Sequence, residues 1–92
     1  MDLIMKIKKG FVIREVMGQH VAVAVGEAAR DFRGMVKLNS TAVDIWKLID
    51  SGLDENGIVD AMLEEYDVDR ETLCADVRKI ISELCDGGFV EL

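Results

Sequence analysis

The clearest hydrophobic pattern in the chain lies in its C-terminal quarter. Apolar residues follow one another there at steps of four, three, one and three positions: Leu73, Val77, Ile80, Ile81 and Leu84. These steps place them on one stripe of an amphipathic helix. Asp69 before the stripe can cap the free amides of the first turn, and Gly87 and Gly88 can release the chain after it. The pattern predicts a long helix that begins after Asp69 and ends before Gly87, with one face in a core.

Two shorter helices are predicted before this one. Asn39 is a good N-cap for the first, and Leu38 can pack against it as a hydrophobic staple. The apolar residues on its inner face are Ala42, Ile45, Trp46 and Ile49, with Leu48 beside them. Ser51 and Gly52 end this helix.

The second of these helices is predicted to start at Asp54, again as an N-cap. The residues of its buried side are Ile58, Val59, Met62, Leu63 and Tyr66. Gly57 lies in the first turn and should weaken it by about 1 kcal/mol relative to alanine.

The N-terminal half follows the two-residue period of strands. Phe11–Val16 is rich in β-forming residues, and in residues 21–25 three valines alternate strictly with two alanines. Residues 17–20 between them are typical of an exposed turn with Gly18 at its centre. The pattern therefore predicts a β-hairpin.

A third strand is predicted after an irregular segment. Residues 26–32 break both periods and are interpreted as a loop, and residues 34–38 form a short strand. Residues 1–10 are a basic lead-in, either a frayed end or a first edge. Residues 89–92 can form a last extended segment.

The element order predicts an α+β fold in a single domain over residues 1–92, because strands come first and helices follow. An N-terminal three-stranded antiparallel sheet is followed by a three-helix bundle, and a helix–turn–helix with the sheet as its wing is available. The short third strand is expected at an edge. It carries neither proline nor alternating charges, only Lys37, so it is open to the addition of an extended peptide as a further strand.

Composition narrows the class of protein. Half of the 92 residues are apolar, enough for a core without disulfides or metal. No apolar run approaches the roughly 20 residues of a membrane span, and the start has no signal-peptide pattern, so a soluble cytoplasmic protein is expected. Cys74 and Cys85 lie eleven positions apart on the predicted last helix, about 16 Å along its axis, too far for a disulfide. His20 is the single histidine, and no metal site is expected.

Motifs of catalysis and cofactor binding are missing from the sequence. No nucleophile lies beside a base in a recognisable pattern, and there is no phosphate-binding glycine motif. The chain is therefore interpreted as a non-enzyme without a cofactor.

Charge is distributed unevenly. Residues 1–38 carry seven Lys or Arg against four Asp or Glu, whereas residues 39–92 carry four against fourteen. A helix that reads DNA should bring cations to phosphates, but the last predicted helix has a net negative charge. Nucleic-acid binding is therefore not expected. The acidic half is either a solvated surface or the contact for a basic partner.

Several segments together resemble the PqqD family of peptide-binding domains, also called RiPP recognition elements. The similarity extends from about Lys8 to Leu92. Its most characteristic parts are the strand with its Leu38-Asn39 cap and the helix that carries Trp46. The end of the second helix, residues 64–69, and the closing residues Val77, Ile81, Leu84, Gly88 and Phe89 also match. Asn56 and Gly57 depart from the pattern, where the family more usually has good helix formers.

The resemblance implies a winged helix–turn–helix that binds the leader segment of a precursor peptide. The leader adds as a strand beside the third strand, against the third helix, and a radical SAM enzyme or another peptide-modifying enzyme is often the partner. On this sequence, the pairing edge would be Met35, Val36, Lys37 and Leu38, and the facing helix residues would be Leu73, Val77, Arg78 and Ile81.

Each of these helix residues has a structural alternative. The three aliphatic side chains would form the groove floor or simply pack in the core. Arg78 would meet a leader carboxylate or be an ordinary surface charge. Trp46 is a candidate aromatic anchor, but its place on the helix stripe favours core packing.

Three functions remain open from the sequence. The first is a non-catalytic adaptor that captures a leader peptide and presents it to a modifying enzyme. The second is a subunit that binds a maturase directly, without a leader, through its acidic helices. The third is a winged-helix regulator that binds DNA, motivated only by the helix–turn–helix. Whether the chain is a monomer or a homodimer also stays open.

Overall fold

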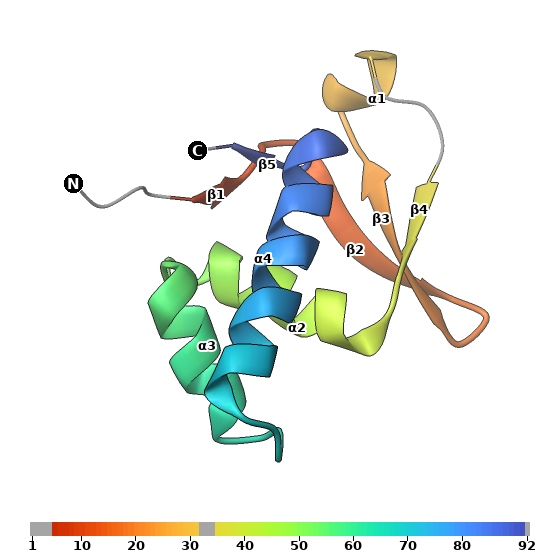
Figure 1. Cartoon of the computed structure of the whole chain (residues 1–92). Coiled ribbons are helices and arrows are strands. Elements are labelled where there is room, and N and C mark those ends of the chain that lie inside the picture. The colour runs from red at the N-terminus through yellow and green to blue at the C-terminus, as the bar shows by residue number, and fades with distance from the viewer. Residues whose placement is uncertain (1–4, 32–34, 92) are drawn as a thin grey trace.

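The computed structural model describes residues 5–31 and 35–91 and places a β-sheet beside a group of helices (Figure 1). In chain order the elements are β1 (Lys6–Ile7), β2 (Phe11–Val16), β3 (Gln19–Ala24), α1 (Ala28–Asp31), β4 (Met35–Leu38), α2 (Ser40–Asp50), α3 (Glu55–Leu63), α4 (Arg70–Asp86) and β5 (Val90–Glu91). A three-stranded antiparallel sheet precedes the three longer helices, which confirms the α+β class. The finer interpretation as a winged helix–turn–helix stays a prediction.

The main sheet has the order β2-β3-β4, with both neighbours antiparallel to the central β3. The predicted hairpin is β2 and β3, and the predicted third strand is β4. Gly34, which the sequence analysis placed at the start of that strand, lies outside the described residues, and the strand is observed from Met35.

The hairpin turn is tighter than the sequence analysis predicted. Val16 and Gln19 pair, so only Met17 and Gly18 form the turn, with φ angles of 52° and 79°. Positive φ at both positions is the type I′ geometry, whose twist matches that of the flanking strands. Gly18 adopts a positive φ without steric cost because it has no β-carbon. Met17 adopts it although its side chain makes this conformation uncommon. His20 consequently lies within β3 and is half-buried, which corrects its placement in an exposed turn.

The two ends of the described chain pair with each other. β1 and β5 form a two-stranded antiparallel sheet, in which Ile7 lies opposite Val90. The amide of Lys8 also donates to the carbonyl oxygen of Phe89 over 2.7 Å. The basic lead-in is therefore partly a strand, and its partner is the predicted last extended segment. The segment predicted as a loop between β3 and β4 contains the short helix α1, which is a second correction.

The three predicted N-caps are confirmed. The carboxamide oxygen of Asn39 accepts from the amide of Ala42 over 2.8 Å. The carboxylates of Asp54 and Asp69 accept in the same way from the third residue of their helices, at 2.8 and 2.7 Å. Each cap satisfies one of the amides that a helix start leaves free, so the helix starts are encoded locally.

The helix α3 is shorter than predicted. It ends at Leu63, so Tyr66 lies beyond it, and the Tyr66 hydroxyl donates to Asp44 over 2.6 Å. Gly57 lies in the first turn of α3, where a β-carbon would stand 3.3 Å from the capping oxygen of Asp54 and from Leu53. This close approach gives a structural reason for glycine at the position where the sequence departs from the family pattern that it resembles.

The core lies where the helices meet one face of the sheet and the β1–β5 pair. Its members come from all three longer helices, from β3 and from both ends: Met5, Ala22, Ile45, Trp46, Ile49, Ile58, Val59, Met62, Leu73, Val77, Leu84, Phe89 and Val90. Phe89 is the aromatic centre, with ring centroids 5.7 Å from Trp46 and 5.0 Å from Phe11. Trp46 is 4% exposed, so the structure places it in the core.

The described residues contain neither a membrane-spanning helix nor a cluster of metal ligands. None of their helices has the length and apolar character needed to cross a membrane. No three of their His, Cys, Asp or Glu side chains are grouped in a way that would hold a metal ion.

Candidate binding groove

The strand β4 is the open edge of the main sheet. Among the described strands it pairs with β3 alone, so the prediction of an edge strand is confirmed. It is four residues long, enough to pair with a short extended segment.

The direction of each main-chain group of β4 follows from the hydrogen bonding of β3. The amide of Val25 donates to the carbonyl oxygen of Gly10 over 2.7 Å, which marks that opposing pair as hydrogen-bonded. Hydrogen-bonded and non-bonded pairs alternate along an antiparallel ladder. Val23 and Val21 therefore bond toward β2, and Ala22 bonds toward β4.

The partners on β4 complete this alternation. Val36 lies opposite Ala22 and Leu38 opposite His20, so Val36 and Leu38 bond to β3. The main-chain groups of Met35 and Lys37 consequently point to the open side. These two residues supply the donors and acceptors that an added strand would use.

Side chains of β4 alternate between the two faces of the sheet. Leu38 packs against the core, and Val36 shares that face, because its neighbour Ala22 is a core residue. Val36 is nevertheless 40% exposed. An added strand would cover this exposed apolar surface beside the helices. Lys37 is exposed on the opposite face.

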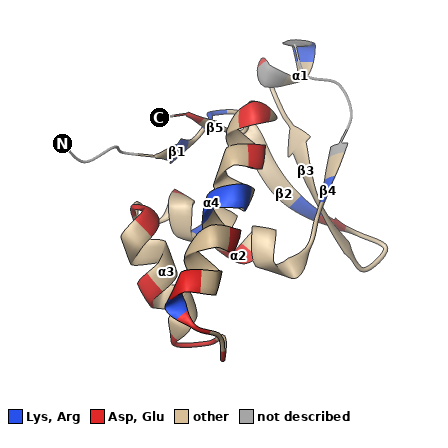
Figure 2. Cartoon of the chain, viewed as in Figure 1, with Lys and Arg blue, Asp and Glu red and all other residues tan. Residues whose placement is uncertain are grey.

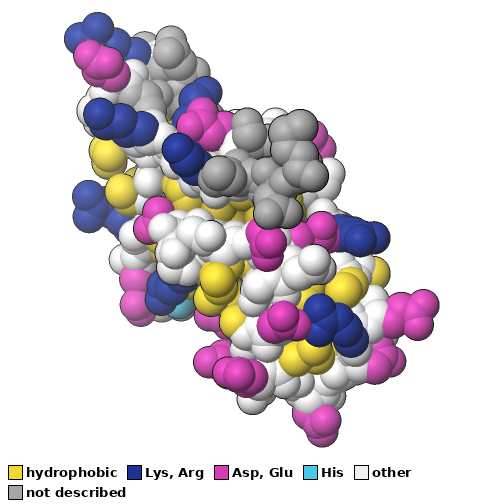
Figure 3. All heavy atoms as spheres, turned by 90° about the vertical axis from the view of Figure 1, so that its left-hand side faces the viewer, with side chains coloured by type: hydrophobic (Ala, Val, Ile, Leu, Met, Phe, Trp, Pro, Cys, Tyr) yellow, Lys and Arg dark blue, Asp and Glu magenta, His cyan; other side chains and the backbone are white. Residues whose placement is uncertain are grey.

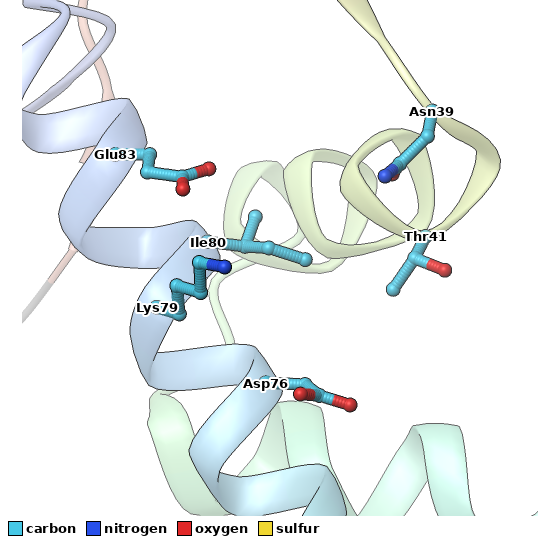
Figure 4. A pocket seen from close by; sticks show the side chains of 6 residues that line it. All are labelled: Asn39, Thr41, Asp76, Lys79, Ile80 and Glu83. Carbon is cyan, nitrogen blue, oxygen red and sulfur yellow. The ribbon is translucent and has the colours of Figure 1, made fainter.

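A groove of about 410 Å³ begins one residue after β4 ends, between the start of α2 and α4. The residues that line it are Asn39, Thr41, Asp76, Lys79, Ile80 and Glu83. Figure 4 shows the four α4 side chains extending from one side of the helix toward the first turn of α2. The open strand edge and the groove therefore adjoin each other.

The groove face of α4 differs from its core face. With about 100° between successive residues of a helix, Asp76, Lys79, Ile80 and Glu83 lie within about 100° of one another around the axis. Leu73, Val77 and Leu84 are centred about 90° away, and they are 0–4% exposed. The groove is thus formed by the polar flank of the stripe, together with Ile80 at its margin.

This geometry changes the set of helix residues predicted from the sequence. Leu73 and Val77 are core residues, which is the structural alternative that the sequence left open. Ile81 is half-buried and packs against the core on the flank farther from the groove. None of the three lines the groove.

Arg78 lies about 150° around α4 from the centre of the groove face. Its Nε donates to the Glu55 carboxylate of α3 over 2.6 Å, and this pairing raises the pKa of the guanidinium above its ordinary value. Arg78 therefore ties α4 to α3 and does not line the groove, and its role on the leader-facing side stays a prediction.

The residues of α4 that line the groove were not predicted, although the sequence contains one feature that points to them. Ile80 lies at the edge of the apolar stripe, with Asp76 and Glu83 four positions before and three positions after it. The stripe has two flanks, however, and the sequence does not say which one lies beside the third strand. That choice depends on how α4 is docked.

The charged groups of the groove form no ion pair with other residues that the structure describes. Among the described residues, the ion pairs are Arg70 with Asp60 and Arg78 with Glu55, both between α3 and α4. Asp76, Lys79 and Glu83 take part in neither pair. The groove therefore presents two negative charges and one positive charge around Ile80.

The rest of the helical surface is strongly acidic. Figure 2 shows Asp and Glu along α3, α4 and their connection. On the side of the molecule turned away from β4, acidic side chains surround small apolar areas (Figure 3). Such a surface repels phosphates, so it gives no support to the DNA-binding alternative.

Comparison with known proteins relates this geometry to a family and to solved complexes. The family model of coenzyme PQQ synthesis protein D (PqqD) matches residues 19–90. A solved chain from the complex of TbiB1 with the TbiA(beta) leader peptide is 27% identical, with a TM-score of 0.75 over 94% of both chains. A lasso peptide synthetase B1 complexed with its leader peptide is 16% identical, with a TM-score of 0.78 over 98% of this chain and 100% of that one; this likeness supports the fold. A search of curated protein sequences found no match.

Proposed function

The chain belongs to the PqqD family, and from this premise we propose that it captures the leader segment of a ribosomally made precursor peptide by strand addition at β4. The observation that carries the proposal is the open edge of β4 beside a groove on α4. The similar TbiB1 chain was solved with a leader peptide, which supports the same class of ligand here.

The bound leader would pair with the main-chain groups of Met35 and Lys37. Its side chains on the helix side would cover Val36 and enter the groove against Ile80. Main-chain pairing would supply affinity for any extended peptide, and the groove would supply selectivity through alternate side chains.

The role proposed for the chain is that of an adaptor without catalytic activity. It would act as one peptide-recognition domain and hold the leader, while a separate modifying enzyme, such as a radical SAM protein, acts on the rest of the precursor. A strand-shaped binding site suits this division, because it holds one segment and leaves the following residues free.

The proposal can be tested with a proline in the strand edge. The amide of Lys37 points to the open side, so Lys37→Pro removes a donor needed by the leader and leaves the pairing with β3 intact. The matched control is Lys37→Thr, which removes the same charge but keeps the amide. A synthetic leader from the short reading frame nearest the gene serves as the ligand.

We expect the wild type and Lys37→Thr to bind this leader with similar affinity, and Lys37→Pro to lose at least about tenfold. Circular dichroism and thermal unfolding should show that all three variants are folded. In the wild type, amide chemical shifts should move along residues 35–38. Equal binding by the proline variant, or shifts confined to other elements, would contradict strand capture at β4.

A further inference from the structure

The groove beside β4 has a specific charge pattern along α4. In order along the helix axis, Asp76 is followed by Lys79, Ile80 and Glu83. At about 1.5 Å per residue, Asp76 lies about 6 Å before Ile80, and Glu83 lies about 4.5 Å after it. An apolar contact is thus flanked by a carboxylate on each side.

The distance from Asp76 to Glu83 along the axis, about 10.5 Å, is about 3 Å shorter than the span of five residues of an extended peptide, a difference that long Lys and Arg side chains can bridge. Alternate side chains of a strand point to the same face and are about 6.6 Å apart. In the view of Figure 1, the axes of β4 and α4 are roughly parallel, with opposite chain directions. A strand added to β4 would therefore bring three alternate side chains past Asp76, Ile80 and Glu83 in turn.

We propose that the groove selects peptides with the pattern basic, any residue, aliphatic, any residue, basic. The aliphatic side chain would cover Ile80, and the two cations would pair with Asp76 and Glu83, which have no ion-pair partner among the described residues. The pattern reads the same in both directions, so it holds whether the peptide runs parallel or antiparallel to β4. This inference rests on the proposed strand capture and adds the chemistry of the selected segment.

Lys79 adjusts this selectivity from the rim. It lies about 100° from Ile80 around α4, toward the solvent side of the groove, and partly offsets the two carboxylates. Replacing it with an acid should therefore strengthen the binding of a basic peptide. If these exposed residues only supported the fold, substitutions at Lys79 and at Asp76 or Glu83 would not change the affinity for a basic peptide in opposite directions.

The experiment compares two baits on one display library. Extended twelve-residue peptides with five randomised central positions are selected on the wild-type chain and on the double variant Asp76→Lys, Glu83→Lys. We expect the wild type to enrich basic residues on both sides of an aliphatic one, and the double variant to enrich acidic residues there. The same aliphatic position should persist in both selections.

Affinities are then measured by fluorescence anisotropy on the selected peptides. The double variant should bind the basic-flanked peptide about tenfold more weakly than the wild type, and Lys79→Glu should bind it about two- to fivefold more tightly. Both effects should shrink at high salt. The double variant Glu64→Lys, Glu65→Lys, which makes the same change of charge outside the groove, serves as the control and should have little effect.

A second control separates recognition from general attraction to an acidic protein. A peptide of identical composition has its two basic residues shifted by one position, so that they face away from α4. Equal binding of this shifted peptide, or the same enrichment on both baits, would overturn the inference. If either result is found but the peptides no longer bind Lys37→Pro, the proposed strand capture at β4 still holds and only the charge pattern is wrong. If the wild type enriches no peptide, strand capture itself fails.

Discussion

The two sides of α4 differ in burial and in ion pairing. Toward α2 and α3, its apolar residues are buried and two ion pairs, Arg70 with Asp60 and Arg78 with Glu55, connect it to α3. Toward β4, its charged side chains have no ion-pair partner among the described residues, and they border a groove. One side of the helix therefore serves stability, and the other is available for binding.

This contrast teaches that neighbouring residues of one helix should respond differently to substitution. Changes on the inner side should lower the free energy of unfolding and leave peptide affinity unchanged. Changes on the groove side should lower peptide affinity and have only a small effect on the free energy of unfolding. The following predictions test this separation.

The largest effect is expected at Leu73, which is 4% exposed in the core. Leu73→Ala should lower the free energy of unfolding by about 2–5 kcal/mol, because it removes buried methyl groups and leaves a cavity. Chemical denaturation measures this loss, and Ser82→Ala on the exposed side of α4 is the control, expected within about 0.5 kcal/mol. Leader affinity, measured under conditions in which the variant is folded, should not change. A large loss of affinity would indicate that Leu73 contacts the leader.

Ile80 and Ile81 lie at the boundary between the two sides of α4 and allow the most direct comparison of their roles. Both are half-buried isoleucines, but only Ile80 lines the groove. Ile80→Ala should weaken leader binding about tenfold, because about half of an isoleucine side chain loses its apolar contact. Titration calorimetry measures this.

Ile81→Ala is the matched control for Ile80→Ala. Each variant should lose about 1 kcal/mol of stability. A weakening of leader binding by the Ile81 variant equal to that of the Ile80 variant would contradict the assignment of the two faces.

A smaller effect is expected from Tyr66, which connects the end of α3 to α2. Its hydrogen bond to Asp44, helped by partial burial, raises the pKa of the hydroxyl above its ordinary value of 10.0. Stability from this bond is fully present below pH 10.0 and is lost as pH rises through the higher folded-state pKa. Tyr66→Phe should cost about 0.5–1.5 kcal/mol at neutral pH and leave leader affinity unchanged.

Tyr66 is the single tyrosine of the chain, so absorbance at 295 nm reports its titration alone. Asp44→Ala should lower the observed pKa toward the ordinary value. An unchanged titration in that variant would show that Asp44 is not the cause.

The smallest effect concerns the N-cap of α4. The hydroxyl and the amide of Thr72 hydrogen-bond to the Asp69 carboxylate and hold its pKa below the ordinary 3.8. This contribution is present above pH 3.8 and is lost as pH falls through the lower folded-state pKa. The thermal midpoint of the wild type should therefore fall more steeply below pH 3.8 than that of Asp69→Asn, as followed by circular dichroism. Parallel slopes would contradict this role.

The sequence by itself determined the local elements and their order. Asn39, Asp54 and Asp69 marked the three helix starts, because a short polar side chain caps its own helix through a contact three residues away. The alternation of valine and alanine marked β3, and the stripe from Leu73 to Leu84 marked the core face of α4. The family resemblance also followed from such local segments, and the family match over residues 19–90 confirms it.

Tertiary structure decided what depends on contacts between distant parts of the chain. The pairing of β1 with β5 joins residues more than 80 positions apart, and no local pattern encodes that partner. The docking of α4 turned its Asp76 flank toward the start of α2, next to the end of β4, and its Arg78 flank toward α3. A hydrophobic stripe specifies which face of a helix is buried, but its two polar flanks are alike until the helix is packed.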